Sequence, residues 1–209
     1  MHVITKKRQL EMLLQSIPVI PRPKAYLEQY STPATIAADV LWNAHAWGDI
    51  EGMKVVDLGC GTGVFAIGAA LLGAREAVGV DLDAGAVDLA SSQATKMGLN
   101  SKTRFISGDV RNFHEKGDTV IQNPPFGAQK THRKEADRIF MTKALETAPV
   151  IYSFHMRETE EFVEKFFQSK GGKITQKFYY RFPIPRIYDF HEKEKIEVDV
   201  VVLKVEIIS

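Results

Sequence analysis

The chain has 209 residues, of which 44% are hydrophobic and 25% are charged, values that are typical of a globular protein with a buried core. Its formal net charge of +1 excludes binding to a polyanion through overall charge, so any nucleic-acid site must be a local patch. The single cysteine, Cys60, excludes an internal disulfide framework and favours a reducing compartment. Because the sequence shows neither a secretory signal nor a stretch long enough to span a bilayer, we expect a cytoplasmic protein.

The first fifty residues predict a helical extension ahead of the main domain. Apolar residues at helical spacing predict a short amphipathic helix over residues 1–17, and three closely spaced prolines then require an extended connector. A second helix is expected after Thr32, which would cap it, with Pro33 at its first position and its end near Trp47.

From residue 53 onward, short apolar segments alternate with helical segments, which predicts a parallel sheet covered by helices on both faces. Strands are expected at residues 54–58, 77–80, 103–106, 119–121 and 150–154, and helices at residues 64–72, 84–97, 136–147 and 158–167. Two long alternating segments with no helix between them, 173–182 and 195–207, predict an antiparallel pair at one edge. We therefore expect one α/β domain over residues 1–209, a doubly wound, mostly parallel seven-stranded sheet (core 51–209) with an N-terminal helical extension (1–50).

A glycine-rich loop follows the first expected strand and reads Asp57-Leu58-Gly59-Cys60-Gly61-Thr62-Gly63. Ligands of open α/β sheets bind at the carboxyl ends of the strands, where glycines let the backbone approach them closely. A dinucleotide-binding enzyme would carry G-x-G-x-x-G, whereas this loop reads D-x-G-x-G-x-G, a spacing that opposes a nicotinamide cofactor. An acid in the place of Asp57 suits the ammonium group of S-adenosylmethionine better than a pyrophosphate.

Acidic residues also follow the next two expected strands. Asp81 ends the second strand, where a carboxylate can accept from both hydroxyls of a ribose, while Asp83 is better placed to cap the following helix. Asp109 follows the third strand and can accept from an adenine amine, with the backbone of Val110 at the ring edge. Any one of these acids could be a surface or capping residue. Together with the glycine loop, at the ends of successive strands, they predict an S-adenosylmethionine site.

The segment Asn123-Pro124-Pro125-Phe126 ends the fourth expected strand. The Asn123 side chain and the Pro124 carbonyl offer two acceptors for the hydrogens of a planar amine. Adenine N6 is a poor nucleophile because its lone pair is delocalised into the ring, and two acceptors aimed at its hydrogens favour a more tetrahedral nitrogen. The prolines stiffen the chain, and Phe126 offers a face on which an extruded base can stack. The alternative, a plain turn with a core aromatic, is disfavoured by the position of the segment after the adenine acid.

Together with the glycine loop, this tetrapeptide resembles the Asn-Pro-Pro-aromatic class of amino methyltransferases. With Leu-Glu-Gln-Tyr-Ser-Thr-Pro at 27–33, Tyr-Ser-Phe-His at 152–155 and Phe-His-Glu-Lys at 190–193, nearly the whole chain resembles an archaeal relative of the small-subunit ribosomal RNA adenine-N6 methyltransferase. The resemblance implies cofactor contacts at Gln29, Thr32, Gly59, Thr62, Val64, Asp81, Asp109 and Val110. The full predicted cofactor site adds Tyr30, Asp57, Gly61, Gly63, Leu82 and Asn123. The tetrapeptide would hold the target adenine, and no metal is expected.

The resemblance also implies a protein partner. In eukaryotic relatives a small zinc-binding activator protein adds a strand to the free edge of the sheet. The strand order that the family implies places the strand at 103–106 outermost, beside the strand at 77–80. This strand has little edge protection, since it contains no proline and Arg104 is its only charge. Met97 and Leu99 would add apolar surface along the same margin. The alternative is an edge that is simply solvated or shielded by a neighbouring loop.

The tetrapeptide does not choose the substrate, because DNA adenine and protein glutamine methyltransferases share it. Two alternatives therefore stay open: a protein glutamine N5-methyltransferase, although that family usually carries a larger helical domain, and a non-catalytic subunit, although the acids and the tetrapeptide are intact. The basic residues that follow the tetrapeptide could clamp RNA phosphates or form an ordinary solvated loop: Lys130, His132, Arg133, Lys134 and Arg138. His155 could line the substrate side, although a lone histidine is more often structural.

Overall fold

The computed structural model describes residues 4–21, 30–125, 133–185 and 195–207. Its strands are β1 (Lys54–Leu58), β2 (Glu76–Asp81), β3 (Thr103–Ser107), β4 (Thr119–Gln122), β5 (Val150–Met156), β6 (Gly172–Pro185) and β7 (Lys195–Ile207). Its α-helices are α1 (Lys7–Gln15), α2 (Ala34–Ala46), α3 (Val64–Leu71), α4 (Ala84–Lys96), α5 (Arg133–Thr147) and α6 (Glu160–Ser169). Two short 3-10 turns, η2 (Val110–Asn112) and η3 (Arg157–Thr159), follow β3 and β5.

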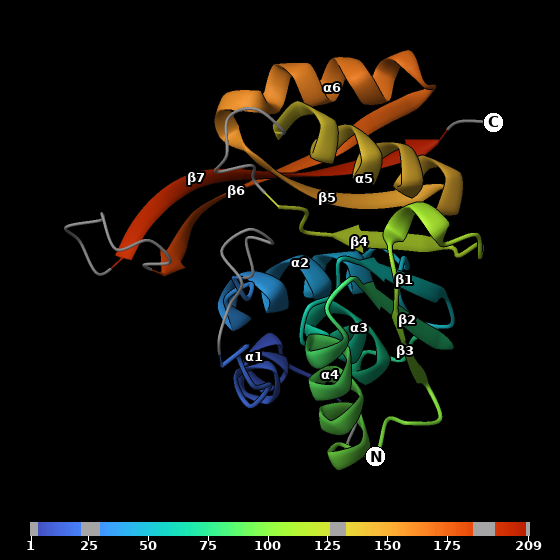
Figure 1. The fold of residues 1–209 in the computed structure, drawn as a ribbon, viewed down its shortest axis with the longest axis vertical. Coiled ribbons are helices and arrows are strands. Elements are labelled where there is room, and N and C mark those ends of the chain that lie inside the picture. The colour runs from blue at the N-terminus through green and yellow to red at the C-terminus, as the bar shows by residue number, and fades with distance from the viewer. Residues whose placement is uncertain (1–3, 22–29, 126–132, 186–194, 208–209) are drawn as a thin grey trace.

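The strands form one sheet in the order β3-β2-β1-β4-β5-β7-β6 (Figure 1). The neighbours from β3 to β5 are parallel, while β7 pairs antiparallel with both β5 and β6. The predicted α/β class, the mostly parallel sheet and the antiparallel pair at one edge are therefore confirmed. The helices α1 to α4 lie on one side of the sheet and α5 and α6 on the other (Figure 1).

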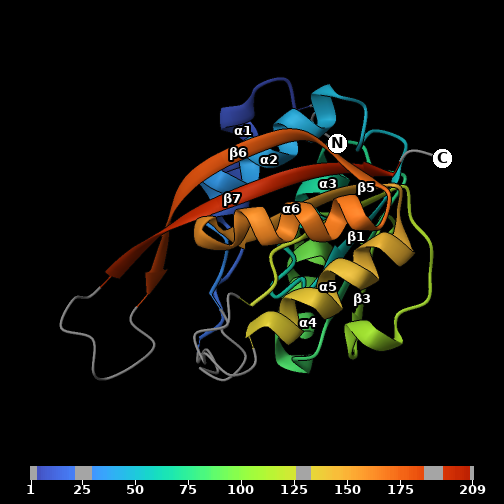
Figure 2. The same cartoon turned by 90° about the horizontal axis from the view of Figure 1, so that it is seen from above.

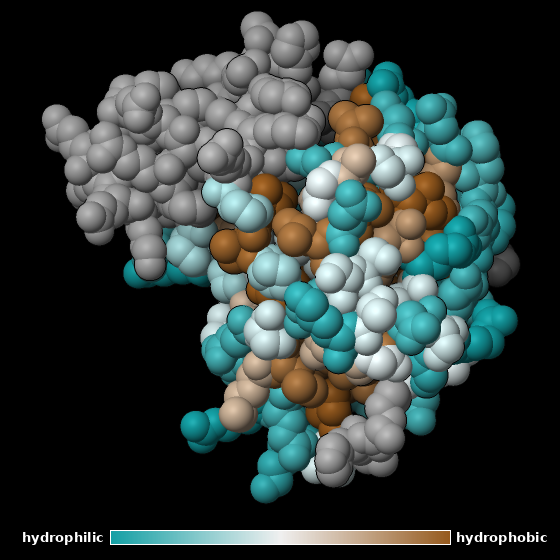
Figure 3. All heavy atoms as spheres, turned by 60° about the horizontal axis from the view of Figure 1, so that its bottom comes forward, coloured by the Kyte–Doolittle hydropathy of each residue, from teal (hydrophilic) through white to brown (hydrophobic). Residues whose placement is uncertain are grey.

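The central strands β1, β2, β4 and β5 are buried on both faces. Successive strand residues point to opposite sides, and helices cover both sides. Val55 and Ala77 belong to the core beneath α1, α2 and α3, whereas Val56 and Val78 belong to the core beneath α5 and α6. On the face that Figure 3 shows, apolar side chains gather toward the middle and hydrophilic side chains lie along the right-hand margin. Within the described residues, no helix is both long enough and apolar enough to cross a membrane.

The pair formed by β6 and β7 runs past the rest of the sheet on the side of the carboxyl ends of the parallel strands (Figure 2). Met156, the last residue of β5, pairs with Val200, so the first part of β7 pairs only with β6. The overhang lies on the side where ligands of this sheet class bind.

The N-terminal extension packs onto the sheet through α3. Leu10, Leu14 and Leu41 are fully or almost fully buried in the same core as α3. Gly68 of α3 makes this approach possible, since a Cβ there would overlap the Leu41 side chain. The close packing of α2 on α3 fixes the chain just before α2 above the carboxyl ends of β1 and β4.

The structure corrects two details at the edges of the predicted elements. Thr32 does not cap α2, because Ala37 N donates to the carbonyl of Pro33 at 2.9 Å, which makes Pro33 the N-cap residue. Leu99 is fully buried and packs into the core, so it adds no apolar surface beside β3. Met97 is partly buried against the same core. The prediction that β3 is an edge strand is confirmed by its terminal place in the sheet.

Candidate active site

A cavity of about 360 Å³ opens at the carboxyl ends of the parallel strands. Its wall combines the connector before α2, the glycine loop, the ends of β2 and β4, the turn η2 and one side of α5. The predicted cofactor residues that line it are Tyr30, Thr32, Gly59, Gly61, Thr62, Val64, Asp81, Leu82, Asp109, Val110 and Asn123. Residues from segments far apart in the sequence therefore meet at one hollow, as the strand-end argument requires.

Two parts of the predicted site fall elsewhere. Gln29 and Phe126 lie outside the described residues. Pro125 lines the cavity, whereas Pro124 is buried and is not part of the wall. Gly63 also lies behind the wall, where its φ of +84° and the nearness of the Phe105 ring leave no room for a side chain.

The glycine loop is held against β2 by backbone hydrogen bonds. Gly59 N and Cys60 N both donate to the carbonyl of Val80, at 2.8 and 3.0 Å, and Gly61 N donates to Asp81 Oδ2 at 2.8 Å. Gly59 and Gly61 have φ angles of +74° and +51°, which favour glycine. The loop therefore presents bare backbone to the cavity at a fixed distance from Asp81.

Asp81 links the loop to the start of α4. Its Oδ1 accepts from Asp83 N at 2.9 Å, while its Oδ2 accepts from Gly61 N. Burial raises the pKa of the Asp81 carboxyl, and these two backbone donors oppose the rise. Each oxygen keeps a second lone pair, so the carboxylate can also accept from a diol that enters the cavity. Asp83 accepts from Gly85 N at 3.0 Å and so caps α4, as expected.

Asp57 does not line the cavity. Its side chain is buried beneath the loop, where Oδ2 accepts from Ala66 N in the first turn of α3 at 3.0 Å. Burial raises the pKa of Asp57 to about 7, and Oδ1 has no hydrogen-bond partner among the described residues. The predicted contact with the cofactor ammonium is therefore not supported by this position. Asp57 instead ties the glycine loop to the helix that follows it.

Asp109 has a partner that the sequence did not reveal. Arg111 donates to it from its backbone N at 2.9 Å and from its guanidinium Nε and Nη2, forming a forked ion pair within η2. The Arg111 guanidinium lowers the pKa of Asp109, so this carboxylate is charged at neutral pH and can accept a further donor. Both residues line the cavity. The sequence signal that could have indicated this ion pair is the position of Arg111 two residues after Asp109.

Asn123 lies at the end of β4, and a hydrogen bond to the segment before α2 holds its side-chain amide. Its Nδ2 donates to Thr32 Oγ1 at 3.0 Å, across 91 residues of sequence. Its Oδ1 is buried and has no hydrogen-bond partner among the described residues. The amide therefore offers an unused acceptor beside the cavity, which is the chemistry predicted for holding an amine.

His155 and Cys60 are not reactive groups of this site. His155 lies inside β5, is fully buried, and its Nε2 lies 2.6 Å from Ser153 Oγ, which also accepts from Gln122 at 2.9 Å. Burial lowers the pKa of His155 to about 3, so it is neutral, and it does not line the cavity. Burial raises the pKa of the Cys60 thiol, which excludes a ready thiolate.

Other wall residues had no sequence signal. Ile20 and Ser31 come from the connector before α2, Phe65 from α3, and Ile139 and Phe140 from α5. Their apolar or neutral side chains resemble ordinary core residues until the fold brings them together. Among the described residues, no group of three or more His, Cys, Asp or Glu side chains could hold a metal ion.

Comparison with known proteins gives consistent matches. A family model, the methyltransferase small domain, matches residues 38–148. An uncharacterized protein of Methanocaldococcus jannaschii is 44% identical over 96% of this chain and 94% of its own. An rRNA N(6)-adenosine-methyltransferase of Danio rerio is 34% identical over 93% of this chain and 96% of its own. A crystal structure from Pyrococcus horikoshii has a TM-score of 0.90 at 39% identity and covers 99% of this chain and 100% of that chain.

Replacing Asp81 by alanine should weaken S-adenosylmethionine binding by about 1–3 kcal/mol, the cost of leaving hydrogen-bond partners unsatisfied. Calorimetric titration of both proteins measures the difference. Asp88→Ala, which removes an exposed acid of α4, is the matched control and should bind as the unaltered protein does. Tight NAD binding without S-adenosylmethionine binding would overturn the cofactor assignment.

Replacing Thr32 by valine should lower kcat by about tenfold, because the Asn123 amide loses its hydrogen-bond partner while the side-chain shape is nearly kept. Thr32→Ser keeps the hydroxyl and should retain most of the rate. Steady-state methyl transfer gives kcat, and titration gives the cofactor Kd. A loss confined to the Kd, with kcat unchanged, would show that Thr32 contacts the cofactor and does not position Asn123.

Proposed function

We propose that this chain, which belongs to the methyltransferase small domain family, methylates N6 of an adenosine in ribosomal RNA of the small subunit. The chain is an S-adenosylmethionine-dependent methyltransferase. The observation that carries the proposal is the buried, unused acceptor of Asn123 at the cavity wall. The sequence relationship to an rRNA N(6)-adenosine-methyltransferase over most of both chains supports RNA as the substrate.

The described residues fit the cofactor. The cavity volume of about 360 Å³ lies in the range of ligand pockets, about 300–1,000 Å³. We assign the ribose hydroxyls to Asp81, the adenine to Asp109 and the backbone of Val110, and the methionine end to the glycine loop. The two acids are held ready by backbone donors or by Arg111, so neither needs to move to meet its partner.

The cofactor supplies an activated methyl group on a sulfonium, so the protein has to align the acceptor nitrogen. Asn123 Oδ1 and the carbonyl of Pro124 would each accept one hydrogen of the adenine amine. Hydrogen bonds to both acceptors would favour a more tetrahedral nitrogen, whose lone pair can point toward the methyl group. These hydrogen bonds are strongest in the transition state. Thr32 accepts the hydrogen bond of the amide nitrogen, which would leave the amide oxygen available to the amine. The nitrogen would become strongly acidic once it is methylated and would lose one proton to water through these acceptors, so a strong general base is not required.

The two alternatives meet different observations. A protein glutamine methyltransferase would use the same tetrapeptide, so only a comparison of substrates separates it from an RNA enzyme. A non-catalytic subunit would not require an amide held in place with a free acceptor. Transfer of labelled methyl to small-subunit ribosomal RNA, compared with a release factor, tests all three. Cys60, the only cysteine, supports the cytoplasm as the place of this activity.

Asn123→Ala should lower methyl transfer to RNA by about 100- to 1,000-fold, as for the loss of one hydrogen-bonding group that acts on the transition state. The cofactor Kd should change by less than about threefold, because the amide acts on the target amine. Asn43→Ala is a matched control, since the hydrogen bond of that amide among the described residues goes to the carbonyl of Asp39 within α2. Labelled methyl on adenosine at the unaltered rate in Asn123→Ala would remove this role.

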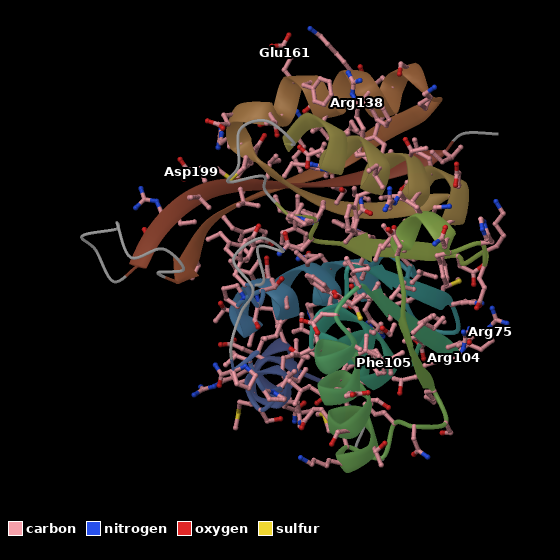
Figure 4. The ribbon with its side chains drawn as sticks, in the orientation of Figure 1. Arg75, Arg104, Phe105, Arg138, Glu161 and Asp199 are labelled. Atoms are coloured by element: carbon pink, nitrogen blue, oxygen red, sulfur yellow. The ribbon has the colours of Figure 1, made fainter. Side chains whose placement is uncertain are left out.

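We further propose that a small zinc-binding activator protein adds a strand at β3. Lys102 O accepts from Ala77 N, and Gly108 N donates to Asp81 O, so the even-numbered residues of β3 face β2. The backbone groups of Phe105 and Ser107 therefore point outward along a free edge. Figure 4 shows Phe105 and Arg104 side by side on this strand. A partner strand would satisfy these groups by β-augmentation.

Ser107→Pro removes one outward N–H without breaking the ladder to β2, so it should abolish co-purification with the activator and leave the melting temperature of the isolated chain nearly unchanged. Ser107→Ala keeps the N–H and should bind as before. Co-expression with the host's zinc-binding activator, followed by pull-down, measures the effect. Undiminished capture by Ser107→Pro, or full activity of an unpartnered monomer, would contradict docking at β3.

A further inference from the structure

A second hollow adjoins the cofactor cavity on the side of α5. It has a volume of about 310 Å³ and lies between η2 and the outer face of α5. Arg111 and Ile139 line both hollows, so the two are direct neighbours. The other residues that line it are Arg138, Thr142, Lys143 and Glu146. Three of the six described residues that line it are cationic, whereas the described wall of the cofactor cavity is mostly uncharged.

The three cations differ in how they are compensated. Lys143 is almost buried and its Nζ lies 2.7 Å from Glu146 Oε2. Arg111 forms its ion pair with Asp109. Arg138 has no carboxylate partner among the described residues, and its guanidinium lies over the ring of Phe162, 5.5 Å from the centroid. The hollow therefore contains one arginine whose charge no acid of the described chain balances.

The cation–π contact with Phe162 helps to hold the Arg138 side chain in place. An arginine plane on an aromatic face loses side-chain freedom while its N–H groups stay open at the edge of the plane. Those N–H groups match the oxygens of a phosphate in a bidentate way. Arg138 belongs to the second turn of α5, and Figure 4 shows it on the α5–α6 side of the molecule, away from Arg75 and Arg104.

We propose that this hollow, with Arg138 as its principal cation, is a phosphodiester-binding subsite for the RNA strand beside the target adenosine. This proposal rests on the proposed function. A base that enters the active site must leave its stack, and its flanking backbone then needs a fixed position. The hollow lies next to the cavity across Ile139, and its exposed cation supplies the charge that a phosphodiester requires.

The test measures binding of a small-subunit ribosomal RNA fragment by fluorescence anisotropy over a series of salt concentrations. Arg138→Ala should weaken RNA binding about three- to tenfold and lower the slope of log K against log salt by about 1. The RNA KM should rise in parallel, while kcat and the cofactor Kd stay within about twofold, since the contact holds the strand and not the reacting atoms. Arg138→Lys keeps the charge without the planar guanidinium, and its RNA affinity should lie between those of the unaltered protein and Arg138→Ala.

Arg75→Ala is the matched control. Arg75 is exposed like Arg138, but it lies at the opposite end of the sheet and pairs with Asp118 at 3.3 Å. Equal losses in Arg75→Ala and Arg138→Ala would mean that overall charge, not this hollow, governs RNA binding, and would overturn the subsite. Unchanged affinity and salt slope in Arg138→Ala would also overturn it.

The outcomes separate the subsite from the proposed function. If Arg138→Ala weakens RNA binding but the unaltered protein transfers no methyl to RNA, the subsite stands and the proposed reaction fails. If RNA is methylated at N6 and Arg138→Ala binds it normally, the reaction stands and the subsite fails. If the unaltered protein binds no RNA even at low salt, both are overturned.

Discussion

The hydrogen bonds that hold the glycine loop are the constraint on which the site depends. Gly59, Cys60 and Gly61 donate to the end of β2, and Asp57 accepts from the first turn of α3. The loop is thus fixed between its own strand, the next strand and its helix, and its backbone can line a cavity without collapsing into it. Loss of these bonds would move Asp81 as well, because its carboxylate is part of the same network.

The N-terminal extension completes this site and does not merely precede it. Tyr180 OH donates to Asp39 Oδ2 at 2.7 Å and Lys7 Nζ lies 2.6 Å from Asp39 Oδ1, so α1, α2 and β6 meet at one carboxylate. Together with the packing at Gly68, these contacts place Thr32 over the end of β4. The orientation of the Asn123 amide is therefore set by the segment that carries Thr32. Motifs at the strand ends alone give no indication of this link.

The sequence predicted the sheet and most of the cavity because strand-end position follows from the alternation of strands and helices. The structure departs from the expected picture where a single side-chain direction decides which group faces the cavity. Asp57 lies between Val56 and Leu58, which both face the α5 side, so the pleat turns Asp57 toward α3 and beneath the loop. Arg111 could not be assigned, because its ion pair with Asp109 exists only once η2 forms. Thr32 was interpreted as a helix cap because it precedes Pro33 at the expected start of the helix. Its bond to Asn123 joins two segments that are distant in the sequence, so local pattern did not indicate it.

The distribution of paired charges reconciles a net charge of +1 with the proposed RNA substrate. At the amino ends of β1 to β3, Arg104 and Lys54 both lie within 3.5 Å of the carboxylates of Glu76 and Glu115, and the Arg104 guanidinium helps to lower the pKa of Glu115 to about 2. These cations are neutralised within the protein and offer little to a phosphate. Arg138, by contrast, is stabilised by an aromatic ring, which fixes its direction without cancelling its charge. A polyanion would therefore be attracted by the cations that no carboxylate balances at the carboxyl ends of the strands. Which arginines remain unbalanced depends on the partner that each one contacts in the fold.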